Sequence, residues 1–357
     1  MDLVNRTPLS ANLVVSELIP EAPRIGVLTA KATYRFDRSG HTELESESPI
    51  DLFDSDQEVE LGLLPRDDLP RGDDVFEIIL LGAAHPPGGR QVPAMRVGLS
   101  VGRVHREMAV FGDRSWVGHG SNAYVSRPQP FSRMPLTWDR AFGGSRELFV
   151  DVDSPVTVSD LANPAGRGFD PEPKAKGLAD LMDCPPGFPV WERHRELPNL
   201  ESMAEPIQGW DDAPSPVCWA TVPLSSAFHI LRAVEVDPDP DSDDPVTVTD
   251  RIHHRAHPDW IIDLPPPGAL IAVQGLQPAG EIRFELPQLR VLADYVVGPR
   301  SGTLELVPQM LVLLPEEERF YLVFRSRFNV AFTKGEERAF RLRTEPGWYG
   351  PTQGETT

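Results

Sequence analysis

The chain has 357 residues, of which 40% are hydrophobic and 25% are charged, so it holds enough apolar material to close a folded core. Its 54 acidic residues outnumber 34 basic ones, and the formal net charge of −20 disfavours nucleic acid as a partner because it would repel the phosphates. The sequence has no run of about 18 apolar residues and no basic-then-apolar leader, so we expect no membrane partner and place the protein in the cytoplasm.

Residues 1–126 are expected to form a β-rich N-terminal part. Alternating apolar and polar residues predict a strand over Val27–Phe36, followed by a turn at Asp37–Gly40. A returning strand then starts at His41–Leu44. Val75–Ala83 has the apolar run of a buried strand.

A hairpin is predicted next, between Ala94–Val101 and Glu107–Phe111. Residues 127–235 change in character, since they are dense in proline, glycine and tryptophan and lack a clean period. The tryptophans are Trp138, Trp191, Trp210 and Trp219. Such large apolar side chains favour packing over disorder, so we expect an ordered, irregular region wrapped over a sheet.

Residues 246–345 are predicted to form a β-rich C-terminal part, before a frayed tail at 346–357. The candidate strands are Gly268–Gln274, Glu281–Leu286, Leu289–Tyr295, Thr303–Val307, Gln309–Leu314 and Phe320–Arg327. The expected fold is mainly β: β-sandwich or meander sheets with a long Pro/Gly/Trp-rich middle and few short helices. The three parts form either one compact unit or two tightly packed domains.

Candidate catalytic and metal-binding residues are few. His253 and His257 have the spacing of a helical metal pair, but Pro258 follows at once and the glutamate of an HExxH motif is missing. Cys184 precedes two prolines and Cys218 stands among apolar residues, which is typical of a structural cysteine. We therefore expect no catalytic residue, no metal and no cofactor.

Two other classes of function stay open. A hydrolase with an unrecognised site would need a deep pocket that joins His194, Asp211 or Cys218. A carbohydrate-binding or structural β-sandwich would instead expose coplanar tryptophans on a sheet face.

The segment Trp138–Gly144, WDRAFGG, is the most distinctive one in the chain. Gly143 and Gly144 permit positive φ and a close approach of backbones. One interpretation is a tight turn that Trp138 and Phe142 lock onto the core. The other is a loop that contacts a partner.

Further motifs occur along nearly the whole chain, from about Asn5 to Phe328. They are NRTPL at Asn5, KATYRFD at Lys31, LGAAHPPGG at Leu81, GDRSW at Gly112, PFSRMPLTWDRAFGG at Pro130, NPAGRGF at Asn163, LPNLE at Leu197, PIQGWDDAPSP at Pro206, HPDWIIDLPPPGALIAVQGL at His257 and FYLVFRSRF at Phe320. In order and spacing they resemble the bacterial type VI secretion accessory proteins, a family long described only as a domain of unknown function. Some relatives carry C-terminal pentapeptide repeats, which this chain lacks.

The resemblance implies a bacterial cytoplasmic adaptor or chaperone without catalysis or cofactor. Its partners would be a toxic effector, often with a PAAR tip domain, and the VgrG spike onto which the effector is loaded. We expect the binding region within residues 130–220. The signature residues proposed for it are Trp138, Asp139, Arg140, Phe142, Gly143, Gly144, Asn163, Gly166, Gly168, Pro198, Asn199 and Trp210.

Overall fold

The computed structural model describes most of the chain. The described residues are 2–16, 24–67, 75–117, 124–151, 154–169, 196–209, 212–224, 226, 234–236, 246–248, 253–330 and 338–349. Within these ranges the protein is mainly β, as the alternating patterns predict, and its helices are single 3-10 turns. No helix among the described residues is long and apolar enough to cross a membrane.

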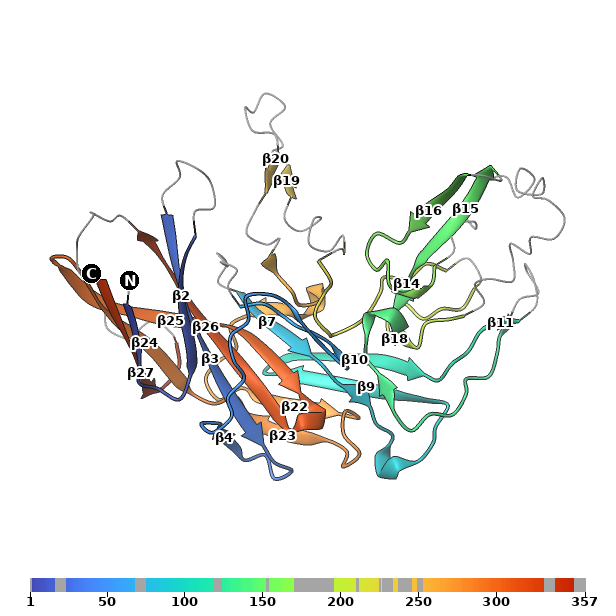
Figure 1. Ribbon diagram of the computed structural model, residues 1–357. Coiled ribbons are helices and arrows are strands. Elements are labelled where there is room, and N and C mark those ends of the chain that lie inside the picture. The colour runs from blue at the N-terminus through green and yellow to red at the C-terminus, as the bar shows by residue number, and fades with distance from the viewer. Residues whose placement is uncertain are drawn as a thin grey trace.

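The larger sheet is mixed and curled, and it fills one end of the molecule in Figure 1. Its order is β1 (Asp2–Asn5), β27 (Arg338–Pro346), β24 (Leu289–Val297), β25 (Arg300–Leu314), β26 (Arg319–Val330), β3 (Arg24–Phe36) and β2 (Ser10–Ser16). Outside this path, β4 (Thr42–Leu44) pairs with β3, β7 (Val75–Leu80) with β25, and β21 (Ile261–Asp263) with β7. The β1–β27 and β7–β25 pairs are parallel.

The long strand β25 corrects one prediction. The sequence suggested two strands separated at Pro308, but the structure has one strand with a register shift between Pro308 and Met310. Proline cannot donate a ladder hydrogen bond, and a bulge is where a strand tolerates it. β25 pairs with β24 up to Leu306, with β26 from Val307 onward on both sides of the bulge, and with β7 after it.

The smaller sheet is antiparallel. Its order is β18 (Leu200–Ser202), β10 (Val104–Phe111), β9 (Ala94–Val101), β22 (Leu270–Gln274) and β23 (Ile282–Glu285). The β9–β10 hairpin was predicted, but its turn is tighter than expected because Val101 already pairs with Val104. Gly102 supplies the positive φ, +58°, that this short connection requires.

The two sheets pack against each other through an aromatic stack. Phe284 of β23 lies 4.8 Å, between ring centroids, from Phe36 of β3 and 5.0 Å from Phe320 of β26. All three side chains are buried in a core shared by both sheets. Each sheet also combines strands from the N-terminal and C-terminal parts, which meet in the β3–β26 and β9–β22 pairs.

Short paired segments complete the structure, and several of them lie at the other end of the molecule in Figure 1. The pairs are β11 (Trp116–Val117) with β12 (Tyr124–Val125), β13 (Met134–Pro135) with β8 (Ala83–Ala84), β14 (Phe142–Gly143) with β17 (Arg167–Gly168), and β15 (Ser145–Asp151) with β16 (Ser154–Ser159). Elsewhere β19 (Val234–Val236) pairs with β20 (Val246–Val248), and β5 (Gln57–Val59) with β6 (Gly62–Leu64). The 3-10 turns are η1 (Pro87–Gly89), η3 (Trp138–Arg140), η6 (Pro258–Trp260) and η7 (Pro315–Glu317).

The middle region and the tail differ in part from the sequence-based expectations. The β15–β16 hairpin was not predicted, although SRELFVD and SPVTVS are rich in β-formers. Trp138 and Trp219 are buried, whereas Trp191 and Trp210 lie outside the described residues. In the expected frayed tail, residues 350–357 also lie outside the described residues. The indole of Trp348, in the same tail, donates to the carbonyl of Pro265 at 3.0 Å.

Candidate functional site

The distinctive loop Trp138–Gly144 begins as the 3-10 turn η3 and ends in β14. The indole Nε1 of buried Trp138 donates to the carbonyl of Ala220 at 3.2 Å. Phe142 is also buried, at 4% exposure. The two aromatic side chains therefore fix both ends of the turn in the protein interior, and neither is available to a partner.

The two glycines at the end of this loop are required by its geometry. Gly143 has φ +137°, and a Cβ placed on it would lie 2.2 Å from the carbonyl oxygen of Asn163. Gly144 has φ +122°, and its N–H donates to that same oxygen at 2.8 Å. Only glycine allows the two backbone segments to approach this closely.

Asn163 joins the loop to the next signature segment. It is 1% exposed, and its Nδ2 donates to the carbonyls of Trp138 at 2.8 Å and Phe142 at 2.9 Å. Gly166 packs beside it, because a Cβ there would lie 2.4 Å from that Nδ2. One amide thus holds the start and the end of the Trp138–Gly144 turn.

Asn199, in the segment that begins at Leu197, also binds the Trp138–Gly144 loop through hydrogen bonds. Its backbone N–H donates to the carbonyl of Arg140 at 2.8 Å, and its Oδ1 accepts from the Arg140 guanidinium at 3.1 Å. Its Nδ2 donates to the carbonyl of Phe111 and to a carboxylate oxygen of Asp113, both at 3.1 Å. Asn199 itself is fully buried.

The structure therefore brings the predicted signature residues together. Gly168, with φ +94°, completes the assembly, since a Cβ there would lie 3.0 Å from Cδ of buried Pro198. We call residues 138–144, 163–168 and 198–199 the signature block. Trp210 lies outside the described residues.

The solvent-facing side of the signature block is charged. Three carboxylates are well exposed there: Asp139 (58%), Glu196 (77%) and Asp113 (64%). Arg167 lies between two of them, 3.6 Å from the Asp139 carboxylate and 3.7 Å from that of Glu196, and Arg140 lies 3.8 Å from Asp113. We call these five residues the charged rim.

A polar hollow of about 260 Å³ adjoins the rim. Its lining is Asp113, Arg114, Ser115, Ser126, Arg127, Gln129, Arg167, Glu196 and Leu197. At its base Arg114 pairs with buried Glu201 and lies 3.7 Å over the ring of Phe111. Burial raises the pKa of Glu201 and lowers that of Arg114, in each case against the attraction of the partner.

A family model described as "Uncharacterized protein conserved in bacteria (DUF2169)" matches residues 21–325. The chain belongs to this family. The matched range contains the entire signature block and the charged rim. No curated protein and no solved structure is similar enough to this chain to match.

Catalytic and metal-binding candidates find little support among the described residues of this DUF2169 chain. Cys218 is fully buried, its thiol contacts the carbonyl of Leu136 at 3.3 Å, and burial raises its pKa to about 12, so it is not a nucleophile at neutral pH. The described residues hold no group of three His, Cys, Asp or Glu side chains placed to bind a metal ion. His194, Asp211 and Cys184 lie outside the described residues.

One further triad of polar side chains lies on the smaller sheet. Ser100 Oγ and His105 Nδ1 share a hydrogen bond of 2.7 Å, and His105 Nε2 lies 3.6 Å from Glu107. Hydrolysis would also need free backbone donors for an oxyanion. Because β9 lies between β10 and β22, the N–H groups beside Ser100 are engaged in the sheet and offer no free donor for an oxyanion.

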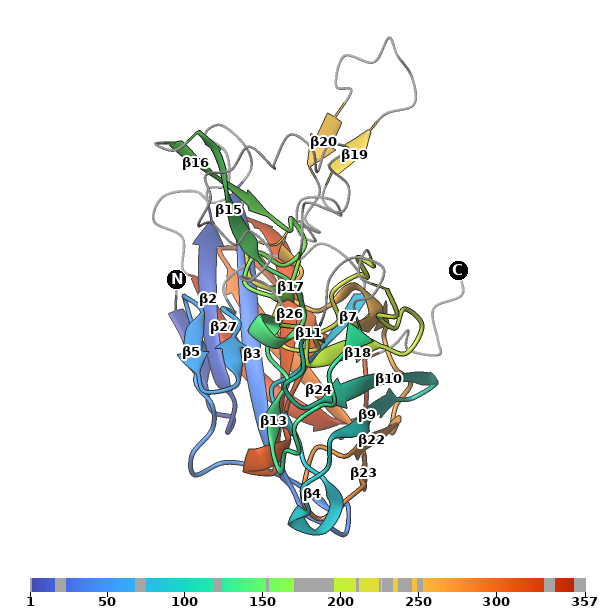
Figure 2. The ribbon, with the colours of Figure 1, turned by 90° about the vertical axis from the view of Figure 1, so that its right-hand side faces the viewer.

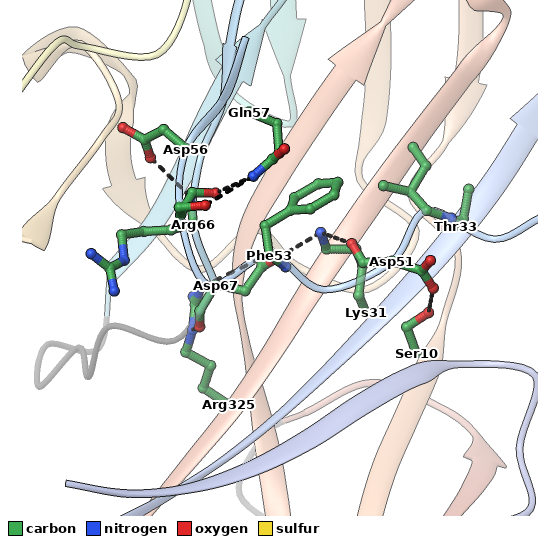
Figure 3. A network of polar contacts seen from close by, with 12 residues as sticks. Ser10, Lys31, Thr33, Asp51, Phe53, Asp56, Gln57, Arg66, Asp67 and Arg325 are labelled. Atoms are coloured by element: carbon green, nitrogen blue, oxygen red, sulfur yellow. Dashed lines mark hydrogen bonds and ion pairs between the residues drawn. The ribbon is translucent and has the colours of Figure 1, made fainter. Parts of the chain in front are cut away.

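Sequence reasoning missed a buried charge cluster on the larger sheet, shown in Figure 3. The ammonium of Lys31 lies 2.7 Å from the Asp67 carboxylate and donates to the carbonyl of Asp51 at 2.7 Å. The rings of Phe53 and Tyr321 flank it at 4.3 and 4.5 Å. Burial lowers the pKa of Lys31 while Asp67 opposes that shift, and the cluster pins residues 51–67 to the sheet.

A second buried cation, Arg255, holds three segments together. Its guanidinium pairs with both carboxylate oxygens of Asp56, at 2.8 and 2.7 Å, and Glu77 accepts from its backbone N–H at 2.6 Å. Burial alone would raise the pKa of Asp56, but the hydrogen bonds from Arg255 keep it below its ordinary value. The sequence carries a signal for Glu77, which interrupts the apolar run of Val75–Ala83, but none for Lys31, which stands at a polar position of an alternating strand.

Proposed function

We propose that this protein is a non-enzymatic bacterial adaptor that binds a secreted toxic effector and helps load it onto a type VI secretion spike. The observation that carries the proposal is the architecture of the signature block. Its buried tryptophan, glycines and asparagines form a rigid support, and the groups left exposed are charged side chains. A binding protein needs such a supported surface, whereas an enzyme needs reactive groups in an enclosed site.

The charged rim suits recognition of another protein. Its exposed carboxylates and arginines alternate over a short distance, which favours a partner with the complementary pattern. Exposed charges contribute modestly to affinity but strongly to orientation and association rate. Four of the five rim residues lie within the region 130–220 that was expected to bind the partner. The fifth, Asp113, lies outside this region in sequence but contacts Arg140 within it.

The identity of the partners rests on the resemblance between the ordered motifs of this chain and the secretion accessory proteins. We propose that the direct partner is an effector with a PAAR tip domain, the VgrG spike, or both, and that binding takes place in the bacterial cytoplasm. The membership of the chain in a family conserved in bacteria supports the bacterial part of this assignment.

The experiment is purification of the tagged full chain from its own bacterium, followed by quantitative mass spectrometry. VgrG and a toxin should be enriched together. Replacing Asp139 and Glu196 by arginine should reduce their recovery about tenfold, because the two exposed carboxylates that the rim offers to a partner become positive charges. A matched pair of reversals at exposed Glu47 and Glu58 serves as the control.

Two outcomes would reject parts of the proposal. Recovery of neither VgrG nor a toxin with the wild-type chain would reject the secretion role. Full recovery with the Asp139/Glu196 double variant would keep the role but remove the charged rim as the contact surface.

A further inference from the structure

The outer face of the smaller sheet carries a trough that the signature residues do not reach. Gly98 and Ser100 on β9 and Ala272 on β22 form a floor of small side chains. Longer side chains stand on the neighbouring strands, where His105 pairs with Ser100 and Arg283 with Ala272. The hollow between them measures about 500 Å³, and we call it the sheet trough.

The width of the sheet trough is set by the strand spacing. Its walls rise from β10 and β23, with β9 and β22 between them. Three spacings of about 4.8 Å separate the walls by about 14 Å, which accommodates an extended polypeptide with its side chains. The opposite face of the same strands carries Val97, Leu99 and Ile271 in the core, so the floor is held rigidly.

Oxygen acceptors line the sheet trough along the row that crosses Gly98, where the Gln274 side chain covers the glycine. A Cβ on Gly98 would lie 3.2 Å from Oε1 of Gln274, so this amide oxygen points over the glycine. Glu107 stands opposite Gly98 in the ladder, and Glu281 lines the trough from the far wall. An occupant at this point meets two carboxylates and an amide oxygen.

These carboxylates retain capacity for a cation. Glu281 pairs with Arg283 at 2.6 Å through one oxygen, and this arginine is 62% exposed. Among the residues that the structure describes, the ionic partner of Glu107 is His105, at 3.6 Å, which is charged only when protonated. Exposed pairs of this kind contribute about 0–1 kcal/mol each, so an incoming guanidinium competes with them easily.

We propose that the sheet trough binds an extended segment of a partner protein and takes an arginine side chain of that segment between Glu107 and Glu281, above the amide oxygen of Gln274. A planar guanidinium carries five N–H donors and can reach carboxylates on both walls, as an ammonium cannot. Leu270, 45% exposed at the other end of the trough, provides an apolar contact for a neighbouring residue of the segment.

The partner segment approaches from the face of the sheet. Addition of a strand at the β23 edge is blocked, because the turn at Gly40 packs so closely that a Cβ there would lie 2.2 Å from the carbonyl oxygen of Arg283. Figure 2 shows β10, β9, β22 and β23 following one another in the lower right of the molecule, in the order of the sheet.

The test does not depend on the secretion role, since it uses model peptides. A blocked pentapeptide TVRVT, extended by its β-branched residues, is titrated into the full chain labelled at alanine methyl groups. The methyl resonance of Ala272 reports on the trough floor, and that of buried Ala256 reports on unspecific change. We expect a saturable shift of the Ala272 signal alone.

Two comparisons, one between peptides and one between variants, test whether the trough binds the charge of the arginine side chain. A peptide with citrulline in place of arginine should bind at least about fivefold more weakly, because it loses two charged contacts. The double variant Glu107→Gln/Glu281→Gln should weaken binding of TVRVT by a similar factor. Glu47→Gln/Glu58→Gln, with the same change of net charge, should leave it unchanged.

Three results would overturn the proposal. They are the absence of a saturable shift up to about 10 mM peptide, equal binding of the arginine and citrulline peptides, and equal weakening by the trough and control variants. The last would show that only the overall negative charge of the chain attracts the peptide.

Discussion

Replacement of Asn163 by alanine tests whether the signature block is a structural support. The change removes both hydrogen bonds from Nδ2 while it keeps the backbone of residue 163, whose carbonyl still accepts from Gly144. The carbonyl of Trp138 retains the N–H of Ala141 at 3.2 Å, but that of Phe142 loses the buried amide. A net hydrogen bond contributes about 1 kcal/mol, and a buried group left unpaired costs about 1–3 kcal/mol.

We therefore expect Asn163→Ala to lower the free energy of unfolding by about 2–4 kcal/mol, measured by urea unfolding with a common slope. The control is Asn12→Ala on β2, where the side chain is exposed and bonds only the neighbouring N–H of Leu13. That variant should stay within about 0.5 kcal/mol of the wild type. If the two variants unfold at the same urea concentration, Asn163 does not hold the loop as described.

Two further predictions concern backbone geometry and pH. In urea unfolding, Gly143→Ala should destabilise the protein by at least about 2 kcal/mol more than Gly88→Ala. Both glycines have positive φ, but a Cβ on Gly143 would lie 2.2 Å from the carbonyl oxygen of Asn163, whereas a Cβ on Gly88 would meet no atom within 4 Å. Equal losses of stability would contradict this reasoning. Hydrogen bonds from Arg133 lower the pKa of Glu316 below its ordinary value of 4.5. The stability from this contact is present above pH 4.5 and is lost as the pH falls through the lowered pKa. The free energy of unfolding of Glu316→Gln should therefore depend less on pH than that of the wild type between about pH 5 and pH 3. The same pH dependence in Glu316→Gln and Glu317→Gln would refute the assignment.

Several strands were predictable because one of their faces is buried, although β2 and β18 were not predicted. Ala94–Val101 matches its expected bounds because apolar residues alternate along it, and Phe320–Arg327 lies inside the observed β26. The pairing of strands was not predictable, since β1 meets β27 from the opposite end of the chain. Alternation specifies which face of a strand is buried, but it does not specify which strand lies beside it.

The candidate site was predictable as a set of segments and not as an arrangement. The sequence singled out Trp138–Gly144 and the asparagines at 163 and 199. The residues of the loop alone did not show whether it is a turn locked onto the core or a loop that contacts a partner. The hydrogen bonds that Asn163 and Asn199 make with its backbone supply the missing information. The buried charge of Lys31 was missed because it stands at a polar position of an alternating strand, where an exposed side chain is the ordinary expectation.

The pairing of β3 with β26 has a consequence for biosynthesis. Residues 24–36 find their neighbours at 319–330, near the opposite end of the chain. An emerging chain must therefore carry the open edge of β3 through nearly the whole of translation, and contacts so distant in sequence form slowly. Ribosomes that stop before residue 319 release a polypeptide with exposed apolar strands, a substrate for chaperones and proteases rather than a smaller working protein.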